Sequence, residues 1–192
     1  MINNWIMRRK ILLDCDGVIC DFVKSALDLI ARETGSTRFH HEVVEWDIFA
    51  ALGVKHLEPL LYDATNSGGF CENLALIDGS KDGVEMLRRH GDIVIVTSPL
   101  DARNWVYERA MWLKNHFGFS KKEMIFTAAK HMVWGDVLID DSDRNLREWK
   151  EYHPEGCALL WDCPWNRHAG AESNGVIRVS NWHDVNKILE AQ

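Results

Sequence analysis

The sequence predicts an α/β protein with a doubly wound parallel sheet and a small helical cap inserted after the first strand. Short continuous apolar runs are typical of strands buried on both faces of a parallel sheet, and they occur at residues 11–13, 93–96, 137–139 and 158–161. Amphipathic segments alternate with these runs, as expected when helices cover both faces of the sheet. A third observation is that residues 40–70 lack strand periodicity, which indicates a helical insertion.

The first part of the chain is expected to hold one strand followed by helical segments. Residues 10–14 contain the first apolar run and form the first expected strand. Residues 21–34 are expected to be a helix because their apolar residues recur at helical spacing, and Gly35 is placed to end it. Within residues 40–70, Pro59 and several glycines divide the chain into short helical pieces.

The rest of the chain alternates helices with strands. Ser80 is placed to cap a helix at residues 80–90, and Gly91 is placed to end it. Apolar runs predict the later strands, at residues 93–96, 124–127, 137–139, 158–161 and 176–179. Helical spacing of large apolar side chains predicts the remaining helices, at residues 102–116, 144–152 and 182–191.

The length of the chain limits the number of domains. A chain of 192 residues can form one α/β domain with a modest insertion and is too short for two ordinary domains. We therefore expect residues 1–20 and 78–192 to form the core and residues 21–77 to form the cap.

The composition limits the partners and the location of the protein. A net charge of -7 without a basic stripe disfavours extended contact with nucleic acid. No apolar run approaches the length of a membrane span, and residues 1–10 lack the apolar core of a signal peptide. Five cysteines without CxxC spacing favour reduced thiols in the cytoplasm, and Cys15 is expected to pack in the interior. We expect a monomer or a homodimer that binds a small molecule.

Polar residues follow three of the expected strands at the point where each strand ends. The motif Asp14-Cys15-Asp16-Gly17 follows the first strand, and Thr97-Ser98 follows the second apolar run. Lys130 precedes the third run, which ends in Asp140-Asp141. Because functional residues of parallel sheets lie just beyond the carboxyl ends of the strands, we expect these side chains to share one site.

These residue types together suit phosphate chemistry. A carboxylate can attack phosphorus, and a second carboxylic acid can protonate the leaving oxygen and later activate water. Mg²⁺ prefers oxygen ligands, so Asp14 together with Asp140 or Asp141 could hold it. Thr97 or Ser98 could bind phosphate oxygens, and Lys130 could offset the charge that develops on them.

Each motif alone has a simpler interpretation. A single DxDG motif also occurs in turns and in calcium-binding loops. The Thr97-Ser98-Pro99 segment alone is a turn at the end of a strand, and Asp140-Asp141 alone could cap the following helix. Lys130 alone would be an ordinary surface lysine. The order and the spacing of the four motifs together favour the phosphate site.

This ordered set resembles the haloacid dehalogenase superfamily of aspartate-nucleophile phosphatases, and the closer likeness is to its 5'(3')-deoxyribonucleotidase branch. The likeness is carried by DxDGV with the following Asp21-Phe22, by Thr97-Ser98-Pro99, and by Lys130 standing ten residues before Asp140. The segment from Trp161 to Asn166, with its sequence WDCPWN, is also similar to bacterial and phage members of this group.

The resemblance implies a role for each matching residue. Asp14 would be the nucleophile and Asp16 the general acid and base. Mg²⁺ would be bound by Asp14, by the backbone carbonyl of Asp16 and by Asp141, with Asp140 in support. Phosphate would be held by a further set: Thr97, Ser98 and Lys130.

Aromatic residues near these motifs suggest a site for a nucleobase. The resemblance implies that Phe22 and Phe70 enclose the base, and Trp46 or Phe49 could supply another wall. Stacking on a base contributes ~1–3 kcal/mol per contact. The alternative for each of these side chains is that it packs in the hydrophobic core.

Together these observations predict a Mg²⁺-dependent phosphoric monoester hydrolase of the 5'-nucleotidase type, with an aspartyl-phosphate intermediate and a nucleoside or deoxynucleoside monophosphate as substrate. Three alternatives remain open. They are a related phosphatase for another small phosphate ester, a 3'-phosphatase for nucleic-acid ends, and a nucleotide-binding module without activity. The acidic net charge disfavours the second, and the complete set of motif residues disfavours the third.

Overall fold

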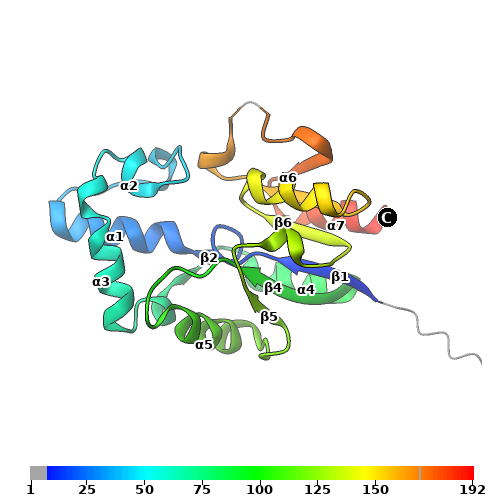
Figure 1. Cartoon of the computed structure of the whole chain (residues 1–192), viewed down its shortest axis with the longest axis horizontal. Coiled ribbons are helices and arrows are strands. Elements are labelled where there is room, and N and C mark those ends of the chain that lie inside the picture. Colours follow the sequence, from blue (N-terminus) through cyan, green and yellow to red (C-terminus); the bar gives the residue numbers. More distant parts are fainter. Residues whose placement is uncertain (1–7, 169) are drawn as a thin grey trace, which may run out of the picture.

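The computed structural model describes residues 8–168 and 170–192, and its core is a six-stranded parallel sheet (Figure 1). The strand order is β5-β4-β1-β6-β7-β8. The strands are β1 (Arg9–Leu13), β4 (Gly91–Thr97), β5 (Met124–Phe126), β6 (Val137–Asp140), β7 (Cys157–Trp161) and β8 (Val176–Val179). All five neighbouring pairs are parallel, so the predicted doubly wound sheet is confirmed. The expectation about a signal peptide at residues 1–10 falls largely outside the described residues.

Helices pack on both faces of this sheet. The described helices are α1 (Phe22–Thr34), α2 (Ile48–Ala51), α3 (Pro59–Ser67), α4 (Ser80–His90), α5 (Trp105–Phe117), α6 (Asp143–Tyr152) and α7 (Trp182–Glu190). Helix α6 covers one face, where Leu146 and Trp149 pack against Leu12 of β1. On the other face, Leu87 of α4 and Leu113 of α5 belong to the same core cluster as the strand residues. Since successive residues of a strand point to opposite faces, both faces of β1 are buried.

Short 3-10 turns lie in the connections between these elements. They are η1 (His40–Glu42), η2 (Lys55–Leu57), η3 (Cys71–Asn73), η4 (Lys130–Met132), η5 (Pro164–Asn166) and η6 (Ser173–Gly175). Two of them, η4 and η5, carry residues of the site described below. None of the helices in the described part of the chain has the length and apolar character needed to cross a bilayer.

The sequence patterns did not reveal a small second sheet, made by β2 (Cys20–Asp21) and β3 (Ala75–Leu76). These antiparallel strands have two residues each, which is too short to produce a periodic pattern. The chain between them contains α1, α2 and α3, and its residues Ile30, Phe49 and Leu61 form a separate hydrophobic cluster. The proposed division into core and cap stays a prediction.

The beginning of α4 differs from the expectation. Gly79, with φ 75°, is the N-cap, and Ser80 is the first helical residue. The hydroxyl of Ser80 is buried and has no hydrogen-bond partner among the described residues. Ser80 as the helix cap is therefore wrong, because the glycine supplies the left-handed turn that leads into the helix. Gly35 does end α1 in the left-handed conformation, as predicted.

Candidate active site

The carboxyl ends of three neighbouring strands meet at one cavity. Strand β1 lies between β4 and β6. The sheet extends beyond β4 to β5 on one side and beyond β6 to β7 on the other. The peptide N–H of Asp14 donates to the carbonyl of Ile139, which ties the residue after β1 to β6. A cavity of about 250 Å³ lies at this edge, and six of the polar residues predicted from the sequence line it: Asp14, Asp16, Thr97, Ser98, Lys130 and Asp141. Such a position between strands is the usual ligand site of an open α/β sheet.

Lys130 connects two of the acidic residues in the interior. Its side chain is 2% exposed, and its Nζ lies 2.8 Å from Oδ1 of Asp14 and 2.7 Å from Oδ2 of Asp140. Burial disfavours the charged ammonium, but the two carboxylates outweigh this effect and raise the pKa of Lys130. Lys130 is therefore a fixed positive charge beside Asp14, and removing it would leave Asp140 buried and unpaired.

The acidic cluster carries more negative charge than Lys130 can neutralise. Burial raises the pKa of Asp14 to about 7, although Lys130 opposes this shift. Burial also raises the pKa of Asp141, and the nearby Asp14 and Asp140 raise it further. Burial and mutual repulsion make these two carboxyl groups difficult to ionise. A cation bound between them would stabilise their ionised forms.

The geometry of the cluster fits a divalent metal ion. One carboxylate oxygen from each of Asp14, Asp140 and Asp141 lies within 4.8 Å of the others. Oδ2 of Asp141 accepts a hydrogen bond of 3.0 Å from Nε1 of Trp165, whereas its Oδ1 is buried without a hydrogen-bond partner among the described residues. An orphaned buried oxygen in an all-oxygen donor set is suited to Mg²⁺.

Gly17 allows the loop after β1 to pass close to Asp141. Its φ is 76°, and a Cβ at this position would lie 2.2 Å from Oδ2 of Asp141. The same loop is fixed by its backbone, since the N–H of Gly17 donates to the carbonyl of Cys20. Both the left-handed conformation and the close approach require glycine at this position.

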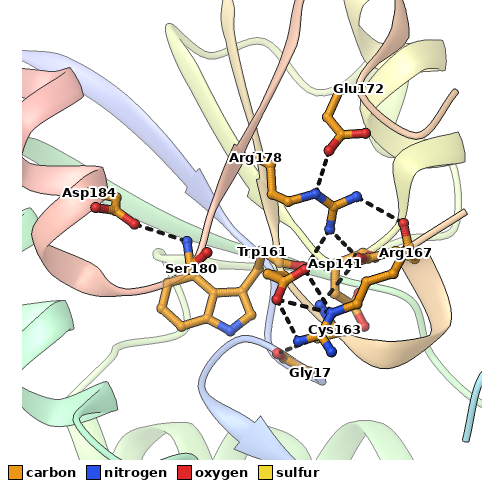
Figure 2. Close-up of polar contacts among 11 residues, drawn as sticks. Gly17, Asp141, Trp161, Cys163, Arg167, Glu172, Arg178, Ser180 and Asp184 are labelled. Carbon is orange, nitrogen blue, oxygen red and sulfur yellow. Dashed lines mark hydrogen bonds and ion pairs between the residues drawn. The ribbon is translucent and has the colours of Figure 1, made fainter. Parts of the chain in front are cut away.

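A polar network supports the opposite side of Asp141. Nδ2 of Asn166 donates to the carbonyls of Asp141 and Trp161, at 2.9 and 2.7 Å. Oδ1 of Asn166 accepts from Nη1 of Arg178 at 2.7 Å. Figure 2 shows the guanidinium of Arg178 in an ion pair with Glu172, which holds it from the other side. The WDCPWN segment, which the sequence analysis identified, therefore contacts Asp141 through Trp165 and Asn166.

Two of the predicted aromatic residues line the cavity, and two do not. Phe22 and Trp46 are part of the wall, with Trp46 remaining 59% exposed. Phe70 packs edge-on against Phe22 at 6.2 Å and is not among the residues around the cavity. Phe49 is 3% exposed and belongs to the hydrophobic cluster of α1–α3. The base-binding role expected of Phe70 stays a prediction; in this structure its ring contacts Phe22, which lines the cavity.

Several residues of the site were not identified from the sequence. Trp105 and Trp165 also line the cavity, and Trp165 contacts the ring of His40 at 5.5 Å between centroids. Asn145 on α6 completes the wall and points its Nδ2 toward Asp140. Beneath Asp16 lies Arg109 of α5, whose Nη2 is 2.8 Å from Oδ1 of Asp16. Trp165 belongs to the WDCPWN segment, although the sequence did not indicate that its side chain reaches the acidic residues, and the other three lie in helices that carry no motif.

A second cluster with metal-ligand atoms lies beside the first, but it does not suit a metal ion. Oxygen and sulfur atoms of Cys15, Asp16 and Cys20 lie within 4.8 Å of one another. The guanidinium of Arg109 already occupies this place, with Nη1 at 2.9 Å from Sγ of Cys20. A permanent positive charge at hydrogen-bond distance opposes a second cation there.

The chain is similar to known proteins in both its sequence and its fold. The chain is 24% identical over 183 residues to a protein of Staphylococcus epidermidis described as a candidate 5'(3')-deoxyribonucleotidase, covering 93% of this chain and 94% of that one. It is 29% identical over 193 residues to a protein of Bordetella pertussis with the same description, covering 91% and 94%. The HAD hydrolase YfnB of Bacillus subtilis, in a structure described as bound to magnesium, has a TM-score of 0.58 at 15% identity. That similarity covers 95% of this chain and 99% of YfnB, and it supports the fold.

A family model covers nearly the whole chain. The model described as "5' nucleotidase, deoxy (Pyrimidine), cytosolic type C protein" matches residues 8–192, from the start of the described structure to the last residue. This range includes all four motifs at the sheet edge and the WDCPWN segment behind Asp141. With a haloacid dehalogenase-type fold and a match of this extent, the chain belongs to the cytosolic type C 5'-nucleotidase family.

Proposed function

We propose that this protein is a Mg²⁺-dependent phosphatase that hydrolyses nucleoside or deoxynucleoside monophosphates through an aspartyl-phosphate intermediate. The observation that carries the proposal is the pairing of Lys130 with both Asp14 and Asp140 at the edge of the sheet, inside a cavity that Thr97 and Ser98 also line. A nucleophilic carboxylate, a buried cation and two hydroxyl groups around one cavity are the parts that phosphoryl transfer requires.

The first step is the transfer of the phosphoryl group to Asp14. Its carboxylate attacks phosphorus, and the bond between phosphorus and the ester oxygen breaks. Asp16, which lines the same cavity, gives a proton to the leaving alkoxide. The ammonium of Lys130, 2.8 Å from Oδ1 of Asp14, offsets the negative charge on the phosphoryl oxygens, and Thr97 and Ser98 donate hydrogen bonds to them.

The second step releases phosphate. Asp16 takes a proton from a water molecule, which attacks phosphorus and breaks its bond to Asp14. Asp14, the backbone carbonyl of Asp16 and Asp141 would hold Mg²⁺, with Asp140 supporting through Lys130. When it is bound, the ion neutralises the charge of the phosphate as the nucleophile approaches. The orphaned Oδ1 of Asp141 supports this assignment, and so does the description of YfnB as a magnesium-bound structure.

The other half of the cavity supports a nucleoside as the group attached to phosphate. Phe22 and Trp46 give it an aromatic wall, and Trp165 lies near the acidic residues. Aromatic rings can stack on any nucleobase, because every base has a flat π-face. The names of the relatives from Staphylococcus epidermidis and Bordetella pertussis agree with this substrate class.

A phosphate-release assay tests this proposal. Purified protein should release inorganic phosphate from nucleoside monophosphates with Mg²⁺ and lose this activity in EDTA. Asp14→Asn should abolish turnover, because an amide cannot form the acyl phosphate. Asp63→Asn makes the same chemical change on the exposed side of α3 and should keep full activity.

Two results would count against the proposal. A folded Asp14→Asn protein with nearly normal turnover would remove Asp14 as the nucleophile. Rapid phosphate release from sugar phosphates, with none from nucleotides, would retain the chemistry and replace the substrate class.

A further inference from the structure

We propose that Arg109 is a positioning residue, which holds one carboxylate oxygen of Asp16 so that the other is presented to the substrate. This inference deepens the proposed function and rests on it, because it concerns the residue assigned there as acid and base. It explains why α5 places a fully buried arginine beneath the catalytic loop.

The guanidinium of Arg109 contacts the loop after β1 at three places. Its Nη2 lies 2.8 Å from Oδ1 of Asp16, and its Nη1 lies 2.9 Å from Sγ of Cys20 and 3.6 Å from Sγ of Cys15. A planar guanidinium with five N–H donors can make contacts in several fixed directions at once. Arg109 thus fixes both ends of the Cys15–Cys20 loop as well as the side chain between them.

The surroundings of Arg109 hold the guanidinium in place. The side chain is completely buried, and its Cζ lies 4.6 Å from the ring centre of Trp105 and 5.9 Å from that of Trp112. Contacts of a guanidinium with the faces of aromatic rings favour a defined position. Because a buried charge needs a partner, the guanidinium in turn restricts the carboxylate of Asp16.

The two oxygens of Asp16 lie in different environments. Oδ1 is buried and meets Arg109 in an ion pair without an aligned hydrogen bond, whereas the side chain as a whole is 27% exposed and lines the cavity. The exposed part of the carboxylate is therefore on the side away from Arg109, which leaves Oδ2 for the substrate and for water. In acid–base catalysis, a third group commonly orients the residue that transfers the proton.

The leaving group of the substrate provides a readout that separates positioning from stability. A nucleoside monophosphate releases an alkoxide, which needs the proton of Asp16. p-Nitrophenyl phosphate releases a phenolate that leaves without one. Asp16 also activates water in the second step, which is the same for both substrates, so the comparison uses kcat/KM, which reports only the steps up to departure of the leaving group. If Arg109 acts through Asp16, Arg109→Met should lower kcat/KM for the nucleotide by about 10–100-fold more than for p-nitrophenyl phosphate, as expected for impaired acid catalysis. Arg109→Lys should restore part of the difference, since it keeps the charge and loses the planar fork.

A double-mutant cycle makes the test independent of the size of the single effects. In the Asp16→Asn background, Arg109→Met should cause less than about a twofold further loss, because the residue on which it acts is already impaired. Arg89→Met, on the exposed face of α4, is the matched control and should leave both substrates unaffected. Thermal melts of every variant identify any that does not fold, and Arg109→Lys then carries the comparison.

The outcomes distinguish this inference from the proposed function. If the wild-type protein releases phosphate from neither substrate, the proposed function is wrong. If the wild type is active and folded Arg109 variants lose equal factors of kcat/KM on both substrates, with the same loss in the Asp16→Asn background, Arg109 has only a structural role and the inference is overturned. A selective loss on the nucleotide that disappears with Asp16→Asn supports it.

Discussion

Trp46 is the most exposed of the aromatic side chains that line the cavity. It lines the cavity and yet is 59% exposed, so its removal should disturb the packing of the protein little. Phe22, in contrast, contacts both Phe70 and Trp105, and its substitution would combine a loss of recognition with a loss of packing. Trp46 therefore gives the cleaner test of the substrate class.

Replacing Trp46 with alanine should weaken selection of nucleotides. A loss of ~1–3 kcal/mol of stacking corresponds to a fall of roughly 5- to 150-fold in kcat/KM for nucleoside monophosphates. Activity on p-nitrophenyl phosphate should change much less, because that substrate has no base. Trp134→Ala is a matched control, since Trp134 is 54% exposed and lies outside this cavity. Equal declines on both substrates in the Trp46 variant would argue against a base site here.

Helix α5 joins the loop after β1 to the segment that leads from α3 to β3. Arg109 contacts Asp16, and the neighbouring Glu108 faces this segment. Oε1 of Glu108 accepts from the N–H of Gly69 at 2.6 Å, and its Oε2 accepts from the N–H of Cys71 at 2.9 Å. One turn later, Nε1 of Trp112 donates to the carbonyl of Leu74 at 2.8 Å. A single helix thus contacts both the loop after β1 and the chain between α3 and β3.

Glu108→Gln should loosen the segment between α3 and β3. The amide of glutamine can accept one of the two backbone hydrogen bonds and turns a donor toward the other, at a cost of about 1–3 kcal/mol for the unsatisfied buried group. Hydrogen exchange at the amides of Gly69 and Cys71 should become faster, and the melting temperature should fall. Glu151→Gln, an exposed change on α6, is the control. Unchanged exchange at both amides would show that Glu108 does not hold the segment.

The acidic site affects the stability of the whole molecule. Because burial raises the pKa of Asp14 from 3.8 to about 7, the folded protein binds a proton that the unfolded chain has already lost in this range. The unfolded state therefore holds fewer protons, and this group makes the metal-free protein less stable as the pH rises from about 4 to about 7. The raised pKa of Asp141 acts in the same direction.

Mg²⁺ should reverse this loss, because it binds the deprotonated carboxylates. We expect Mg²⁺ to increase the melting temperature more near about pH 7.5 than near about pH 5. At a hundredfold excess over its Kd, the gain is about 2.7 kcal/mol, which is roughly 5–10 °C for a chain of this size. Paired acids such as Asp162, whose pKa is lowered by Arg167, have the opposite pH dependence. The quantity to measure is therefore the increase in melting temperature that Mg²⁺ causes at each pH.

Asp14→Asn is the control for this measurement, since it removes one of the two carboxyl groups with a raised pKa and with it an oxygen ligand proposed for Mg²⁺. The increase in melting temperature that Mg²⁺ causes in this variant should be smaller than in the wild type and should depend less on pH. An increment in the wild-type protein that is equal at both pH values would contradict a metal site at these carboxylates.

The sequence alone was sufficient to predict the parallel sheet and the polar residues at the carboxyl ends of its strands. Buried strands produce continuous apolar runs, and Asp14, Thr97 and Asp141 follow directly from their positions at the ends of those runs. The parallel order β4-β1-β6 then brings these positions together without further information. Lys130 does not follow a strand. It was predicted because it stands ten residues before Asp140, a spacing that is part of the likeness to the family.

Tertiary packing determined the remaining parts of the site, since these contacts join residues that no local pattern connects. Arg109 and Asp16 are 93 positions apart in the sequence numbering and 2.8 Å apart in space, and an arginine within an amphipathic helix ordinarily lies at the surface. Phe70 and Phe22 have equally suitable sequence positions, but of the two only Phe22 lines the cavity, and Phe70 packs edge-on against it. Sequence periodicity specifies which face of an element is buried, whereas the partner that each buried side chain meets depends on how the elements pack against one another.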